Sequence, residues 1–209
     1  MKKLLILLYS IFFLNSPYVF ADDISDFEIE GISIGDSLLD YMSEEEILEE
    51  IEENKDIYHF LNEPDKYSEV YKWNNLKIYN DGLSFFVKNN PRSPYITNKN
   101  ENEKFIILGV NGMINYIEDF DSCMVKRDEI IKDLSKIFPY IEKVEYSKVH
   151  RADPSGNSFL EAVYFDFDSG ARIELQCDNF EETIRVKKNW QEGLNISIVS
   201  KEIIDWFLY

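Results

Sequence analysis

The stretch Val163–Cys177, with the sequence VYFDFDSGARIELQC, predicts a β-hairpin. Apolar and polar residues alternate on both sides of Asp168-Ser169-Gly170, a tripeptide typical of a turn. Alternation with a period of two places one set of side chains in a core and the other set in solvent. The positions expected in the core are Val163, Phe165, Phe167, Ala171, Ile173 and Leu175.

The N-terminus has the pattern of a secretory signal peptide. Lys2-Lys3 precedes an apolar run over residues 4–14, and Val19-Phe20-Ala21 has small residues at the two positions that a signal peptidase reads. The run is about 11 residues long, whereas a membrane-spanning helix needs about 20. We therefore predict a signal peptide over residues 1–21 and a periplasmic or secreted protein without a membrane span after cleavage. An uncleaved anchor is the alternative.

Export bears on the two cysteines of the chain, Cys123 and Cys177. In oxidising compartments an even number of cysteines usually forms disulfide bonds, so we expect these two to be joined. Cys177 ends the hairpin and Cys123 lies near the start of a segment with helical spacing, so the bond would attach a helix to a sheet. Two separate buried thiols are the alternative.

The composition describes an acidic globular protein. Its 40 acidic and 22 basic residues give a net charge of −18, and loss of Lys2-Lys3 would leave 20 basic residues. This charge disfavours binding to nucleic acids and to anionic lipid head groups, which require clustered lysine and arginine. An apolar content of 44% suffices for a core, and the length of 209 residues fits one domain, expected over 22–209.

Three helices are expected from their start signals and apolar spacing. Ser43 and Glu46 form a capping box for a helix over about residues 44–54, with a short helical turn before it at 38–41. A second helix should begin after Asp121 or Ser122 and end at Phe138, before a proline. A third should follow Ser200.

The remaining apolar stretches predict strands, joined by turns. Besides the opening hairpin, strands are expected at 27–34, 70–73, 76–79, 83–87, 105–110, 113–117, 142–149, 184–190 and 194–198. Asn80-Asp81-Gly82 and Asn111-Gly112 are expected to be hairpin turns, and 89–103, rich in asparagine with two prolines, a mobile loop.

This order of elements predicts an α+β fold, with an antiparallel meandering sheet and helices packed on one face. A tandem duplication of a helix-plus-hairpins unit is a further hypothesis. It rests on Asp36-Ser37 before Glu46-Ile47, which is echoed by Asp121-Ser122 before Glu129-Ile130 at a different spacing.

Several short motifs together resemble a family of small exported proteins of unknown function from marine alphaproteobacteria. The motifs are Ile32–Tyr41 with Ser43–Ile47, Lys126–Ile130, Asp153–Gly156 before Tyr164-Phe165, and Ser200–Glu202 before Asp205-Trp206. The resemblance covers nearly the whole mature chain. It implies no activity, ligand or site residue.

One group of residues invites a hydrolase interpretation. His150, Asp153 and Ser155 are the residue types of a catalytic triad, but a triad needs its base within hydrogen-bonding reach of the nucleophile and oriented by a third group. Three residues of one Asp-Pro-Ser-Gly turn rarely meet that requirement, so we interpret them as a turn. His150 is expected to be exposed at a strand end, without a partner.

Two acidic motifs are also interpreted as structural. Asp166-x-Asp168-x-Gly170 resembles the start of a calcium loop but lacks its later ligands, and the acids of residues 44–53 suit the solvated face of a helix. No HExxH, CxxC or glycine-rich phosphate loop occurs.

The sequence therefore predicts no catalytic residue, cofactor or metal site. We expect a non-catalytic binding or interaction module with a protein or small-molecule partner in the cell envelope. The alternative is a hydrolase that uses aspartate and glutamate. It would need two carboxylates about 5–10 Å apart in a cleft.

Overall fold

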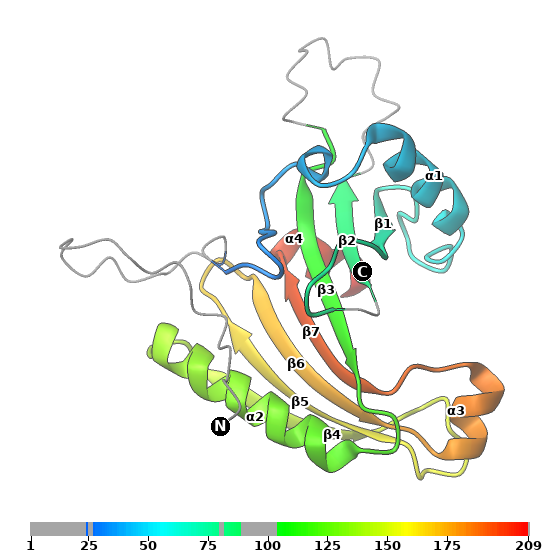
Figure 1. The fold of residues 1–209 in the computed structure, drawn as a ribbon, viewed down its shortest axis with the longest axis vertical. Helices are drawn as coiled ribbons and strands as arrows, with labels where there is room; N and C mark the ends of the chain where they lie inside the picture. The colour runs from blue at the N-terminus through cyan, green and yellow to red at the C-terminus, as the bar shows by residue number, and fades with distance from the viewer. Residues whose placement is uncertain (1–23, 25–26, 80–81, 89–103, 209) are drawn as a thin grey trace.

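A computed structural model describes residues 24, 27–79, 82–88 and 104–208, and in them the chain has the expected α+β fold (Figure 1). The helices are η2 (Leu38–Asp40), α1 (Glu44–Asn54), α2 (Phe120–Ile137), α3 (Glu182–Lys188) and α4 (Lys201–Leu208). The strands are β1 (Tyr67–Lys72), β2 (Leu83–Lys88), β3 (Ile107–Asn115), β4 (Lys143–Val149), β5 (Phe159–Asp166), β6 (Arg172–Asn179) and β7 (Gly193–Val199). The predicted signal peptide, the first two residues of the 80–82 turn and the predicted 89–103 loop lie outside the described residues.

All seven strands form one antiparallel sheet in the order β1-β2-β3-β7-β6-β5-β4. The strands β4 to β7 form a meander, and β3 pairs with β7 to bring the first half of the chain alongside the second. Each half thus contains a helix followed by antiparallel strands. This order is compatible with the duplication hypothesis, which stays a prediction because the second half has an extra strand and α3.

The predicted hairpin is confirmed at the expected register. In β5 and β6, Phe165 lies opposite Ile173 and Val163 opposite Leu175, and all four side chains are buried. Phe167 and Ala171 continue the same buried face at the turn.

The helices cover the sheet unequally. The helices α1 and α2 pack on one face, where Ile47, Ile131 and Leu134 join the main core. The helix α4 packs on the opposite face, where Ile203 and Trp206 join a smaller cluster (Figure 1). The expected packing on one face therefore describes α1 and α2, and α4 covers part of the other face.

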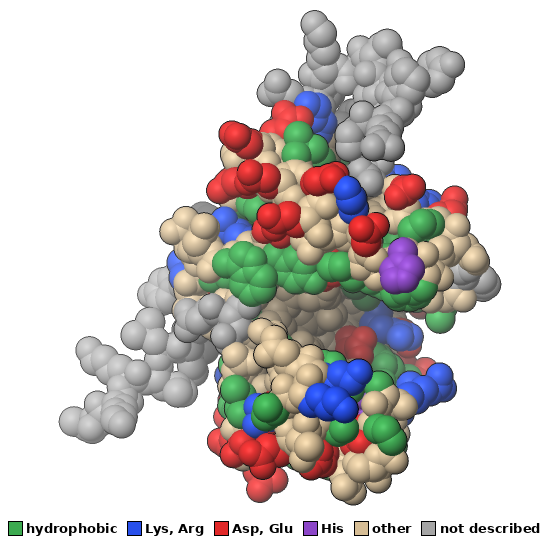
Figure 2. Space-filling model, turned by 90° about the vertical axis from the view of Figure 1, so that its right-hand side faces the viewer, with side chains coloured by type: hydrophobic (Ala, Val, Ile, Leu, Met, Phe, Trp, Pro, Cys, Tyr) green, Lys and Arg blue, Asp and Glu red, His purple; other side chains and the backbone are tan. Residues whose placement is uncertain are grey.

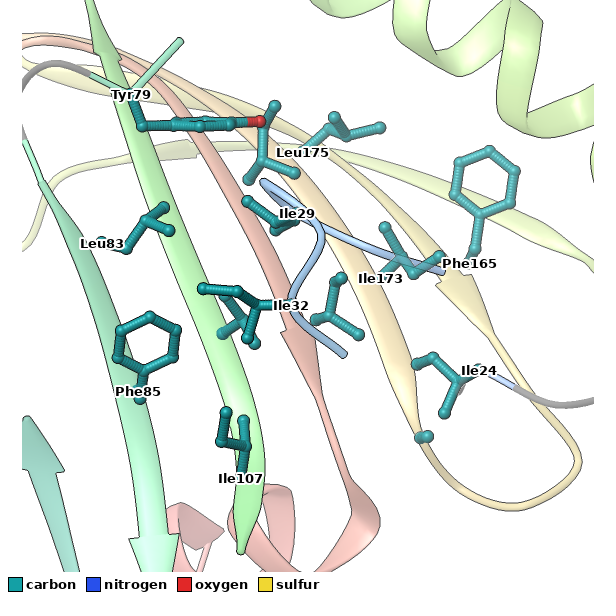
Figure 3. Close-up of a cluster of buried hydrophobic side chains, with 14 of the residues drawn as sticks. Ile24, Ile29, Ile32, Tyr79, Leu83, Phe85, Ile107, Phe165, Ile173 and Leu175 are labelled. Carbon is teal, nitrogen blue, oxygen red and sulfur yellow. The ribbon is translucent and has the colours of Figure 1, made fainter. Parts of the chain in front are cut away.

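The segment before η2 also belongs to the main core. Ile29 and Ile32 are buried over the sheet, in the same cluster as Ile173 and Ile107 (Figure 3). The expected strand at 27–34 is wrong, because its pairing is reduced to one bridge between Ile29 and Ile32. This segment covers the sheet with apolar side chains.

Two strand boundaries in the first half differ from the prediction. Residues 76–79 form no strand, because the Glu30 carboxylate accepts the backbone N–H groups of Lys77, Ile78 and Tyr79. Asn111-Gly112 forms no turn and lies inside β3. A Cβ at Gly112 would come within 2.6 Å of the Tyr79 ring, so the glycine allows that ring to pack against the strand.

Residues 184–190 were expected to form a strand, and most of them lie in α3 instead. The Glu181 side chain accepts the N–H of Ile184 and starts the helix, and Asn189 ends it in the left-handed conformation. Because β6 and β7 already pair with each other, this segment has no place between the two strands that it connects.

The two other predicted helices are confirmed, α4 at the expected start and α2 at an earlier one. Asp119 caps α2, where Asp121 or Ser122 was expected. The helix α4 follows Ser200, but the buried Ser200 hydroxyl has no hydrogen-bond partner in the structure. None of the helices in the described part of the chain is both long and apolar enough to cross a membrane.

The predicted disulfide is confirmed. Cys123 of α2 and Cys177 of β6 are bonded, with 6.0 Å between their Cα atoms, and both are fully buried. The bond therefore attaches α2 to the middle of the sheet.

We expect the replacement Cys177→Ser to destabilise the protein strongly. The bond closes a loop with a sequence separation of 54 residues. A loop of this size contributes about 4 kcal/mol in a chain-entropy treatment. The melting temperature, measured by circular dichroism, should fall by about 8–16 °C. The exposed Ser147→Ala is the control, and an unchanged melting temperature in Cys177→Ser would contradict the expectation.

The replacement Gly112→Ala should destabilise the protein by about 1–3 kcal/mol, because the new methyl group overlaps the Tyr79 ring. Urea unfolding of Gly112→Ala, Tyr79→Ala and the double variant tests this cause. In the Tyr79→Ala background, Gly112→Ala should lower the free energy of unfolding by a smaller amount. Equal costs in both backgrounds would show that the ring is not the obstacle.

Candidate functional site

The sheet face opposite α1 and α2 is polar over much of its area, and we call it the open face. In β6, Glu174 and Gln176 point to this face, while Ile173, Leu175 and Cys177 point into the main core. The helix α4 covers only one end of the open face, around Phe86 and Val199. Among the described residues, no other helix contributes to the cluster on this face.

One row of residues crosses the open face from strand to strand, each directly opposite the next. We call it the central row, and it consists of Tyr71 of β1, Ser84 of β2, Asn111 of β3, Ser197 of β7 and Glu174 of β6. Neighbouring strands lie about 4.8 Å apart, so the row extends over about 19 Å. It combines hydroxyl, amide and carboxyl groups that come from both halves of the chain.

A cleft of about 360 Å³ lies over the central row. Its remaining walls include Trp73, Met113, Gln176, Gln191 and Asn195, and we call it the open-face cleft. Figure 2 shows the hollow on this side of the molecule, between an upper and a lower part. Among the described residues that line it are two glutamates, Glu69 and Glu174, and no lysine or arginine.

A buried aspartate orients two amides of the cleft. The Asp178 carboxylate accepts hydrogen bonds from Gln176 Nε2 at 2.8 Å and from Asn195 Nδ2 at 2.6 Å. Asp178 therefore fixes the orientation of both amides, and each keeps its carbonyl oxygen and one further N–H for a ligand. Burial raises the pKa of Asp178, while the two amide hydrogen bonds stabilise its ionised form.

Two aromatic rings form one wall of the cleft. The Tyr71 and Trp73 rings are nearly parallel, at 4°, with their centroids 5.5 Å apart. The Trp73 ring also lies over Gly82, where a Cβ would come within 2.6 Å of it. Trp73 nevertheless remains 58% exposed. The ring is therefore both fixed in position and open to a ligand.

Glu174 is the ionisable group of the central row. Burial raises the pKa of its carboxyl above the usual value, and this outweighs the opposite effects of Arg172 and of a hydrogen bond with Tyr164. A carboxyl of this kind keeps its proton at a higher pH than an exposed glutamate does. It can then donate a hydrogen bond as well as accept one.

Glu69, the second glutamate of the cleft, is engaged by tyrosines. Its Oε2 accepts the Tyr58 hydroxyl at 2.6 Å, and its side chain is buried. Burial and the Glu69 charge raise the pKa of Tyr58 and of Tyr71. The arrangement holds these rings in the folded structure and leaves Glu69 little freedom to act on a ligand.

The structure does not assemble His150, Asp153 and Ser155 into a triad. The Ser155 hydroxyl donates to Asp153 at 2.8 Å, and Asp153 also accepts the N–H groups of Ser155 and Ser158. These hydrogen bonds, first of all the one from the Ser155 hydroxyl, lower the pKa of Asp153. The turn interpretation is confirmed. The expected exposure of His150 is wrong, because its ring lies half-buried against Trp190 and Phe180.

The other acidic motifs are structural as well. Arg172 donates to both oxygens of Asp166, so that aspartate belongs to an ordinary hairpin ion pair. In α1, Ser43 and Glu46 form the predicted capping box. Within the described residues, no three histidine, cysteine, aspartate or glutamate side chains lie close enough together to hold a metal ion.

The residues of the cleft were not singled out from the sequence. The alternation in residues 171–177 indicates that Glu174 and Gln176 point away from the core. This is the only indication of the cleft in the sequence analysis. Asn111 was assigned to a turn, and no pattern indicates that Ser84 and Ser197 flank it on neighbouring strands.

Comparisons with protein-family models, with curated proteins and with solved structures give no significant match for this chain.

The raised pKa of Glu174 predicts a pH-dependent stability. Because the carboxyl binds its proton more tightly in the folded state than in the unfolded state, the stability of the protein falls as the pH rises from about 4.5 through the folded-state pKa. Glu174→Gln removes this titration. The variant should gain stability over the wild type at about pH 8, and the gain should vanish towards about pH 4.

Urea unfolding at both pH values measures this difference. Glu145→Gln, at an exposed position on β4, controls for the loss of one negative charge. A gain of equal size at both pH values would mean that the Glu174 titration is not its cause.

Proposed function

We propose that this chain is an exported, non-catalytic binding module whose ligand lies in the open-face cleft. Export is supported by the signal-peptide pattern of residues 1–21 and by the disulfide between Cys123 and Cys177, a bond typical of oxidising compartments. The ligand is a protein or a small molecule of the cell envelope.

The observation that carries the proposal is the central row. It places polar side chains from both halves of the chain side by side on a face that, in the described part of the chain, α4 covers at one end only. An antiparallel sheet with one face in water needs only solvated side chains there. A cleft with amides fixed by a buried aspartate and with a partly exposed, positioned tryptophan goes beyond that need. Such concave, preformed sites are where proteins bind ligands.

A hydrolase is less well supported. The cleft does contain two carboxyl groups, but Glu69 belongs to β1 and Glu174 to β6, four strand intervals apart. This corresponds to about 19 Å along the sheet. Pairs that cleave glycosides are about 5–10 Å apart. The nearer acid, Asp178, has its oxygens occupied by Gln176 and Asn195.

Filling the cleft tests the proposal. The replacement Ser197→Trp adds an indole within the central row, and Ser147→Trp makes the same change on the exposed strand β4, outside the cleft. Columns carrying the mature wild type and each variant are exposed to an envelope extract, and retained proteins and small molecules are identified by mass spectrometry. We expect at least one component to be retained by the wild type and by Ser147→Trp, and lost with Ser197→Trp.

Circular dichroism should show that both variants are folded. Identical retention by all three proteins would contradict a ligand in the cleft. Conversion of the retained component into products, abolished by Glu174→Gln, would replace the binding function with the hydrolase.

A further inference from the structure

We infer that the ligand of the open-face cleft is an uncharged saccharide chain. This inference rests on the proposed function and specifies its ligand. Three properties of the cleft carry it: the absence of cationic groups among its described lining residues, an excess of oriented hydrogen-bond acceptors, and a positioned aromatic wall.

The charge of the cleft disfavours anions. Its described lining has two glutamates and no lysine or arginine, and the whole chain has a net charge of −18. Phosphates, nucleotides and acidic sugars would enter without a countercharge, since anion sites in proteins use arginine, lysine or helix N-termini. The floor between the two glutamates is neutral, with Ser84, Asn111 and Ser197 in one line. An uncharged ligand fits this floor better than a cation does.

The hydrogen-bonding groups of the cleft offer more acceptors than donors. Asp178 accepts one N–H each from Gln176 and Asn195, and Asn111 Nδ2 donates to Ser84 Oγ at 3.1 Å. Each of the three amides keeps its carbonyl oxygen, with two lone pairs, and one further N–H. A hydroxyl group donates to such an oxygen and accepts from a neighbouring serine, and saccharides carry a hydroxyl on most of their carbon atoms.

The aromatic wall provides the apolar contact that saccharide recognition needs beside hydrogen bonds. A pyranose ring has an apolar face of C–H groups, which packs against a flat indole. Trp73 is fixed by its stacking on Tyr71 and by its contact with Gly82, so little conformational freedom is lost on binding. Fixed aromatic rings beside amide and hydroxyl groups form a common binding chemistry of proteins.

The length of the site indicates a chain of sugars. The central row continues beyond Glu174 to Tyr164 of β5, which stacks on Tyr146 with 5.1 Å between the ring centroids. The Arg172 guanidinium lies 4.2 Å from the centroid of the Tyr164 ring, and its charge is balanced by Asp166. A second aromatic pair thus lies at the far end of the polar floor, about 24 Å from Tyr71 along the sheet. A single sugar would leave most of this row unused.

A series of three tetrasaccharides tests the ligand class by isothermal titration calorimetry with the mature protein. The neutral probe is the β-1,4-linked tetramer of N-acetylglucosamine, the cationic probe is its deacetylated form, and the anionic probe is a tetramer of galacturonic acid. We expect measurable binding of the neutral probe and none of the anionic probe. Binding of the neutral probe should persist at high salt, because it involves no net charge.

Matched aromatic variants locate the binding. Trp73→Ala should weaken the affinity for the neutral probe at least tenfold, and Trp73→Phe, which keeps a flat ring, should weaken it less. Phe60→Ala is the control, because Phe60 is a 69% exposed aromatic residue that does not line the cleft. It should leave the affinity unchanged.

The possible failures separate the two proposals. Tighter, salt-sensitive binding of the cationic probe would overturn the uncharged class in favour of a cationic ligand. Failure of all three probes, while an extract component is still lost with Ser197→Trp, would refute the saccharide and leave the binding module standing. Saccharide binding that is unaffected by both Trp73→Ala and Ser197→Trp would refute the assignment to the cleft.

Discussion

The structure depends on the burial of one face of the sheet beneath α2. The apolar positions of the β5–β6 hairpin point to this face, and the disulfide between Cys123 and Cys177 attaches the helix to it. The contacts here are long-range in sequence. They fix the orientation of the sheet, because a slip of one residue in either strand would move every apolar side chain to the other face.

The same constraint produces the open face. In β6, each residue that contributes to the core is followed by a polar one, so burial of Ile173 and Leu175 forces Glu174 and Gln176 to the other side. The helix α4 has enough apolar surface for only one end of that side, around Trp206. The remainder stays hollow and polar, and Asp178 is buried there with its amide partners.

The Asn111-Gly112 pair shows that tertiary packing can override a local turn motif. Asn-Gly predicts a tight turn because both residues tolerate positive φ. In β3 the glycine accommodates the Tyr79 ring, and the asparagine faces the cleft as a member of the central row. Similarly, Leu76–Tyr79 has the composition of a strand, but the Glu30 carboxylate occupies the N–H groups that a neighbouring strand would need.

The sequence by itself determined the α+β class, the central hairpin with its buried face, the helices after Ser43 and Ser200 and the disulfide partners. Each of these depends on local periodicity, on a cap or on the number of cysteines. Only the tertiary structure decided the strand order, the helical conformation of most of residues 184–190 and the composition of the cleft. Tyr71, Ser84, Asn111, Ser197 and Glu174 are separated by 13 to 86 residues along their spatial order and become neighbours only through strand pairing. Pairing between distant strands is set by the burial of the whole sheet, and no short window of sequence contains that information.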